Sequence, residues 1–198
     1  MTTTLTYYNQ NAPQFISNTR DIDFRPTQER FLSCLPPSAK ILDFGCGSGR
    51  DTKYFLEHGF SVDAIDGSET LCRLASEYTG IPVRQMLFQE LDSPDTYDGI
   101  WACASILHLP VTELTDVFHK MTAALHDSGI LYTSFKLGRF RGQRNGRYFT
   151  DFDETDFREF IKQFPELTIC ELWITADARP ERSEEKWLNT ILKKMAAR

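Results

Sequence analysis

The chain has 198 residues, of which 41% are hydrophobic and 25% charged, and its formal net charge is −6. This composition is that of an ordinary globular domain, and the negative charge argues against a broad nucleic-acid-binding surface. No apolar run approaches the roughly 20 residues that span a membrane, and the N-terminus lacks the pattern of a secretory signal. We therefore expect a cytoplasmic single-domain protein, monomeric or weakly dimeric, without a membrane partner.

Strands and helices alternate from about residue 40 to about residue 136. Buried-strand patterns lie at 40–44, 61–66, 83–88, 97–104 and 130–135, and helical apolar spacing lies between them, most clearly at 111–125. Alternation of this kind predicts a parallel sheet with helices on both faces, and right-handed crossovers make it doubly wound.

The last segments continue the pattern differently. Residues 157–164 predict a helix, and residues 167–176 predict a strand. Residues 185–194 fit either a helix, through Leu188, Ile191, Leu192 and Met195, or a strand with alternating faces. Periodicity does not decide between the two.

The strongest chemical signal is the segment ILDFGCGSGRD at 41–51, where Gly45, Gly47 and Gly49 end a strand and open a helix. Glycines allow a sharp turn and a close approach of the backbone to a ligand. A dinucleotide-binding fold would have the spacing G-x-G-x-x-G, whereas this loop has G-x-G-x-G. Asp43 beside the loop would repel a pyrophosphate and suits a ligand that carries an amino group. The alternative is a tight turn that binds nothing.

A second signal is Asp66, at the end of the second predicted strand, followed by Gly67 and Ser68. A carboxylate there can accept hydrogen bonds from the two hydroxyl groups of a ribose. The alternative is a helix cap. Ser68 followed by Leu71 offers a capping hydroxyl without Asp66.

These motifs, with VDAIDGS, MLFQELD, YDGIWACASILHL and the terminal WLNTILKK, resemble class I S-adenosylmethionine-dependent methyltransferases. In detail the chain is similar to the small tellurite-resistance and thiopurine types, which often carry G-C-G-x-G-R-D. The resemblance implies a Rossmann-like, doubly wound, mostly parallel seven-stranded sheet with a C-terminal antiparallel strand, and so favours a strand at 185–194. It also implies a helical cap at 1–36 over an α/β core at 37–198.

The resemblance also implies roles for individual residues in holding S-adenosylmethionine. Asp43 would help to hold the amino group, and Asp66 the ribose. Tyr8 would cover the cofactor from the N-terminal segment. The other expected cofactor contacts are Gly45, Cys46, Gly47, Gly67, Ser68, Phe88, Gln89, Glu90, Ala104 and Ser105. The five cysteines have no metal-ligand spacing, and we expect no metal.

His108 follows the fourth predicted strand and should lie near the transferable methyl group. A neutral imidazole there can accept a proton from the acceptor, and the alternative is a packing role. Four arginines and three glycines at 138–147 predict a mobile basic loop, in which Arg141 and Arg144 would bind an anionic acceptor. The alternative is a solvated loop paired with the acidic run at 151–156.

Together these signals favour a methyltransferase that acts on a small molecule, because little chain remains for a separate recognition domain. One alternative is a methyltransferase that acts on RNA or protein through the arginine loop. Two others, of a different class, are an NAD-dependent oxidoreductase and a non-catalytic nucleotide-binding domain.

Overall fold

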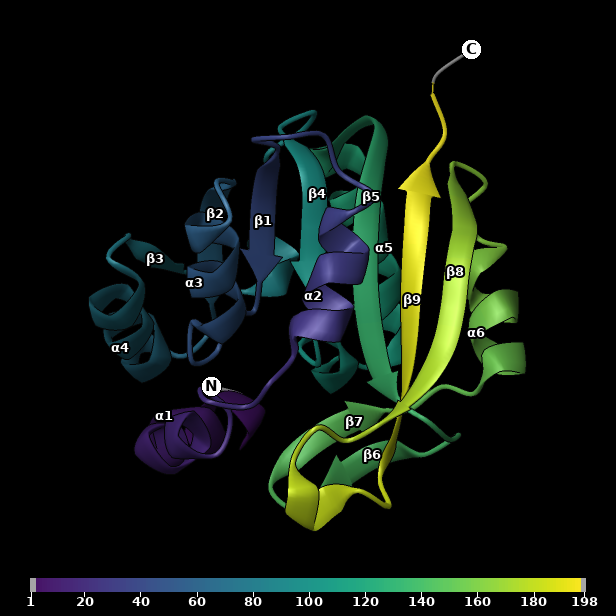
Figure 1. Ribbon diagram of the computed structural model, residues 1–198. Helices are drawn as coiled ribbons and strands as arrows, with labels where there is room; N and C mark the ends of the chain where they lie inside the picture. Colours follow the sequence, from purple (N-terminus) through teal and green to yellow (C-terminus); the bar gives the residue numbers. More distant parts are fainter. Residues whose placement is uncertain (1–2, 197–198) are drawn as a thin grey trace.

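The computed structural model describes residues 3–196 and contains a seven-stranded sheet between two layers of helices (Figure 1). The strand order is β3-β2-β1-β4-β5-β9-β8. The strands are β1 (Lys40–Phe44), β2 (Ser61–Asp66), β3 (Val83–Gln85), β4 (Tyr97–Ala102), β5 (Leu125–Lys136), β8 (Leu167–Ala176) and β9 (Lys186–Lys194).

The sheet is parallel from β3 to β5, and β9 runs antiparallel to both β5 and β8. Leu188, Ile191 and Leu192 of β9 are fully buried. The strand expected at 185–194 is therefore confirmed, and so is the Rossmann-like, doubly wound fold. The helical alternative is wrong because β9 fills the space between two neighbouring strands.

Helices cover both faces of the sheet. One face is covered by helices α2 (Arg25–Leu32), α3 (Arg50–Glu57) and α4 (Glu69–Thr79). On this face Phe31 packs on Trp101, and Trp101 stacks on Tyr132 with ring centroids 3.9 Å apart. Helices α5 (Val111–Ala124) and α6 (Glu154–Ile161) bury the opposite face against Phe118, Phe157 and their neighbours. Within residues 3–196, no helix combines the length and apolar character that crossing a membrane requires.

Several smaller elements gather at the carboxyl end of the parallel strands, at the bottom of Figure 1. These are helix α1 (Thr3–Ser17), the strands β6 (Arg141–Arg144) and β7 (Arg147–Thr150), and the 3-10 turns η1 (Phe88–Glu90), η2 (Ile106–His108) and η3 (Pro180–Arg182). Ligands of open α/β folds bind at this end of the sheet.

The structure corrects three predicted elements. The expected mobile loop at 138–147 forms most of a paired β6–β7 hairpin, whose turn is Asn145 and Gly146 at φ values of 52° and 76°. The third strand ends at Gln85, because η1 starts at Phe88. The fifth strand begins at Leu125, earlier than expected, because Tyr97 of β4 already pairs with Leu125.

Candidate functional site

A cavity of about 930 Å³ lies at the carboxyl ends of β1, β2 and β4 and is bounded by α1, η2, the β6–β7 hairpin and the segment around η3. The structure brings most of the predicted site residues to its wall. These are Tyr8, Gly45, Cys46, Gly47, Asp66, Gly67, Phe88, Gln89, Glu90, Ala104, Ser105 and His108.

The glycine loop forms one wall of this cavity with bare backbone. The N–H groups of Gly45 and Cys46 donate to the carbonyl oxygen of Ile65, which anchors the loop on β2. Gly45 has a φ of +91°, and a Cβ atom there would lie 2.5 Å from Cβ of Ser105. Only glycine fits this position, because a side chain would be strained and would clash. The loop therefore lets a ligand lie directly against the main chain.

Asp66 lies beside this loop at the end of β2. Its Oδ2 accepts a hydrogen bond from the Gly47 N–H at 2.9 Å, and its Oδ1 accepts one from the Ser68 N–H at 2.8 Å. Each carboxylate oxygen keeps a second lone pair for a ligand hydroxyl. Burial raises the pKa of Asp66, while the surrounding backbone N–H groups act in the opposite direction. The cap of α4 is Ser68, whose Oγ accepts from the Leu71 N–H, so Asp66 is not needed as a cap.

The segment after β3 lines the cavity next to β1. The ring of Phe88 packs against Phe44 with centroids 4.8 Å apart. Glu90 accepts a hydrogen bond from the Leu87 N–H, and Gln89 donates to Glu113 at 2.5 Å. These contacts hold the turn η1 in place and present Phe88 to the cavity as a flat apolar surface.

Tyr8 and His108 meet on the side of the cavity formed by α1 and η2. The Nδ1 atom of His108 lies 2.6 Å from the carbonyl oxygen of Tyr148, which can only accept, so Nδ1 carries the proton. Nε2 therefore accepts from the Tyr8 hydroxyl at 2.8 Å. Burial lowers the pKa of His108 to about 4, and the Arg147 guanidinium lowers it as well. His108 is thus neutral near pH 7, with a fixed tautomer.

Four predicted residues lie away from this cavity wall. Asp43 is buried below the glycine loop, where its Oδ2 accepts from Thr52 Oγ1 at 2.5 Å, and burial together with nearby Asp51 raises its pKa. Ser68 is fully buried as the cap of α4. Contacts of either residue with a cofactor stay predictions. In the structure, Asp43 binds Thr52 beneath the glycine loop, and Ser68 caps α4.

Arg141 and Arg144 are the other two predicted site residues that lie away from the cavity wall. Arg141 lies over the ring of Phe152, and Arg144 pairs with Asp151 at 3.0 Å. Neither lines the cavity, because the hairpin pairing turns them toward the ring and carboxylate behind it. Binding of an acceptor by these two side chains stays a prediction, and the described structure directs them away from the cavity.

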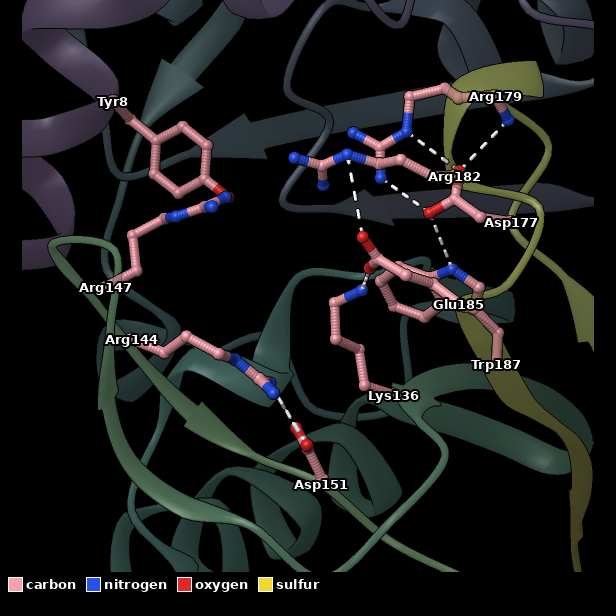
Figure 2. A network of polar contacts seen from close by, with 10 residues as sticks. All are labelled: Tyr8, Lys136, Arg144, Arg147, Asp151, Asp177, Arg179, Arg182, Glu185 and Trp187. Carbon is pink, nitrogen blue, oxygen red and sulfur yellow. Dashed lines mark hydrogen bonds and ion pairs between the residues drawn. The ribbon is translucent and has the colours of Figure 1, made fainter.

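The sequence did not predict several other charged residues that lie in the cavity wall or pair with residues of the wall. Figure 2 shows Arg147 extending toward the Tyr8 hydroxyl, whereas Arg144 extends toward Asp151. Across the cavity, Asp177 accepts from Arg179 and from the Trp187 indole, and Glu185 pairs with Lys136 and Arg182. Only tertiary folding brings these residues together. The one local signal was the Asn145-Gly146 pair, which is typical of a hairpin turn and would have placed Arg147 at its exit.

Comparison with known proteins matches the chain to methyltransferases. Residues 41–129 match the family model described as a methyltransferase domain. An uncharacterized methyltransferase of Staphylococcus carnosus is 24% identical over 164 residues, which cover 78% of each chain.

Two solved structures share the fold. The 1,6-didemethyltoxoflavin-N1-methyltransferase of Burkholderia thailandensis, solved with 1,6-didemethyltoxoflavin and S-adenosylhomocysteine, has a TM-score of 0.77 at 22% identity. The match covers 96% of this chain and 85% of that one. The [4+2]-cyclase SpnF has a TM-score of 0.74 at 12% identity, with 97% of this chain and 95% of that one covered.

Proposed function

Because this chain is a class I S-adenosylmethionine-dependent methyltransferase, we propose that it transfers the methyl group to a small-molecule acceptor. The observation that carries the proposal is one cavity lined by two sets of groups. Asp66 and the glycine loop are one set, and His108 and Arg147, joined by the Tyr8 hydroxyl, are the other. Its volume of about 930 Å³ is large enough for a cofactor and a small acceptor side by side.

The residues present fit the cofactor. Asp66 would accept from the ribose hydroxyls, the bare backbone at Gly45–Gly47 would contact the methionine part, and Phe88 would pack on the adenine. Gly67, Gln89, Glu90, Ala104 and Ser105 would complete the contacts, and Tyr8 on α1 would cover the cofactor. When bound, the cofactor supplies an electrophilic methyl group on a sulfonium. The protein then contributes alignment and exclusion of water.

His108 would face the acceptor through the Tyr8 hydroxyl. The Nε2 lone pair of the neutral imidazole already accepts the Tyr8 O–H, so a proton from the acceptor would pass to the Tyr8 oxygen as Tyr8 gives its own proton to Nε2. With a pKa of about 4, His108 is a weak base, so it can take a proton only from an acceptor that gives one up readily. The tautomer is held by the carbonyl of Tyr148.

The alternatives have less support. A methyltransferase of RNA or protein would need a free basic surface, whereas Arg139 and Arg144 of the expected loop pair with Asp153 and Asp151. An NAD-dependent oxidoreductase would need room for a pyrophosphate where the G-x-G-x-G loop lies above buried Asp43. SpnF has this fold and is described as a cyclase, so catalysis must be tested directly.

Titration calorimetry with S-adenosylmethionine, S-adenosylhomocysteine and NAD tests the cofactor. We expect the first two to bind and NAD to give no heat. A screen of small acceptors, with mass detection of one added CH2 group, then tests the reaction. Binding of NAD without binding of S-adenosylhomocysteine would refute the proposal.

A further inference from the structure

We propose that the acceptor is a small planar molecule with a weakly acidic O–H, N–H or S–H group, bound as its anion against Arg147. This inference rests on the proposed function, because it concerns the acceptor in the same cavity. Arg147 begins β7, directly after the turn of the hairpin, and its side chain lines the cavity.

Arg147 differs from every other lysine or arginine of the cavity wall. Among the described residues, four other such side chains line the cavity, and each has a carboxylate partner: Arg50 with Asp51, Lys136 with Glu185, Arg179 with Asp177, and Arg182 with Glu185. For Arg147 the described part of the chain provides no ion pair. A cation without a counter-ion in a cavity is a site for an anion that comes from outside.

The surroundings of Arg147 strengthen this conclusion. Its guanidinium lies 4.4 Å from the ring centroid of Tyr7 and 5.2 Å from that of Phe149, and its Nε is buried without a hydrogen-bond partner in residues 3–196. Aromatic rings hold the planar group in place and do not neutralise it. A guanidinium held in this way presents a fork of N–H donors to an oxygen or nitrogen anion.

The groups that face Arg147 from neighbouring elements leave its charge uncompensated. They are Tyr7 and Tyr8 from α1, His108 from η2 and Phe149 from its own strand. Burial raises the pKa of Tyr8, and His108 is neutral near pH 7, so neither of these two groups supplies an anion. Asp66 interacts with Tyr8 but already accepts hydrogen bonds from Gly47 and Ser68.

The weak base beside Arg147 defines the acceptor class. The Tyr8 hydroxyl donates to His108 and lies 3.4 Å from Nη1 of Arg147, so the free cation is next to the proton-handling pair. An acceptor that loses its own proton to the solvent needs no strong base. Its lone pair forms the new bond to the methyl carbon, and the carbon–sulfur bond breaks with its electron pair left on sulfur. Tyr148, Phe149 and Trp187 line the cavity, which favours a flat molecule.

The test uses 4-nitrophenol, a planar phenol that ionises near neutral pH and changes colour when it does. It is titrated with the full chain in the presence of S-adenosylhomocysteine, and 4-nitroanisole serves as the neutral counterpart. We expect the bound phenol to have an apparent pKa lower by about one unit or more, as is typical beside a cation. We also expect the anisole to bind more weakly than the phenolate.

Variants then assign the effect to one side chain. Arg147→Gln should remove the pKa shift and weaken phenolate binding about tenfold or more, the effect of losing a hydrogen bond to a charged group. Arg147→Lys keeps the charge and should retain most of the shift. Arg144→Gln, on the same hairpin but outside the cavity, should leave the shift unchanged, and melting curves check that each variant is folded.

The outcomes separate this inference from the proposed function. Binding of S-adenosylhomocysteine with no phenolate binding, or with an unshifted pKa, overturns the anion site and leaves the cofactor assignment intact. Equal effects of the Gln substitutions at Arg144 and Arg147, or loss of the shift in Arg147→Lys, also overturn the anion site. Failure of S-adenosylhomocysteine to bind the wild-type chain overturns both.

Discussion

Asp66 combines a structural and a proposed ligand-binding role in one carboxylate. Each of its oxygens accepts a hydrogen bond from a backbone N–H, one from Gly47 in the glycine loop and one from Ser68 at the start of α4. The side chain therefore shapes the cavity wall, and it still has lone pairs that face the cavity.

Removal of this carboxylate should weaken the cofactor site. Asp66→Ala should reduce the affinity for S-adenosylhomocysteine by about 1.5–3 kcal/mol, the range for hydrogen bonds to a charged group. Calorimetry measures the change. Asp63→Ala is the matched control, because Asp63 lies on the same strand and contacts Tyr97 and Lys40 away from the cavity. Unchanged affinity in a folded Asp66→Ala variant would mean that Asp66 only supports the loop.

His108 should make the stability of the protein depend on pH. Its pKa in the folded state is about 4, below the ordinary 6.5, so between these values the unfolded state binds more protons. Stability should therefore fall as the pH drops from about 6.5 to about 4, by about 2–3 kcal/mol from this residue. Urea unfolding across this window should show a smaller loss for His108→Gln than for the wild type. Equal losses would contradict the assigned protonation state.

Among the helices, strands and turns, the sequence predicted those that contacts between neighbouring residues determine. The glycine loop and Asp66 were predictable because each lies in a continuous strand–turn–helix unit, the loop between β1 and α3 and Asp66 between β2 and α4. Residues 185–194 were ambiguous from periodicity, since pairing with β5 and β8 is a long-range event. The hairpin was mistaken for a loop because its glycines and arginines outweighed the Asn145-Gly146 signal. Arg147 could not be distinguished from Arg144 without the carboxylate of Asp151 in view.

The hairpin turn offers a test at this scale. Gly146 has a φ of +76°, and a Cβ there would make only ordinary contact with Tyr7 at 3.4 Å, so Gly146→Ala adds backbone strain of about 1–2 kcal/mol. We expect faster trypsin cleavage after Arg144 or Arg147 in this variant. Gly80→Ala has similar strain at a φ of +81° at the end of α4 and should leave hairpin cleavage unchanged. Equal cleavage of wild type and Gly146→Ala would show that the turn does not limit access.

At the scale of the whole molecule, a few polar contacts tie the segments around the cavity together. Asn9 of α1 accepts from Ser68 at 2.6 Å, Tyr148 of the hairpin donates to Thr4 at 3.1 Å, and Tyr8 bonds to His108. The seven-stranded sheet below is held by continuous ladders. Opening of α1 and the hairpin should therefore occur without unfolding of the sheet.

Because α1 and the hairpin are held by fewer contacts than the sheet, a bound ligand should stabilise these segments most. S-adenosylhomocysteine at 100 times its dissociation constant should add about 2.7 kcal/mol of stability. Hydrogen exchange read by mass spectrometry should show the largest gain of protection in Thr3–Ser17 and in the glycine loop, with β4 and β5 little changed. Protection gained only in central strands would mean that α1 does not close over the cofactor.

The position of β9 between β5 and β8 has a consequence for how the protein is made. During synthesis, β5 and β8 leave the ribosome before Lys186–Lys194. Until that segment arrives, β5 is paired only on its β4 side and β8 has no partner in the sheet. The half of the sheet from β3 to β5 can form earlier, because the pairs within it do not involve β8 or β9. Meanwhile the open edge of β5 exposes a long apolar strand, the kind of surface on which nascent chains aggregate or recruit chaperones. A chain stalled within the last strand should therefore have a formed glycine loop, an incomplete sheet at β5 and β8, and a tendency to aggregate through the exposed edge of β5.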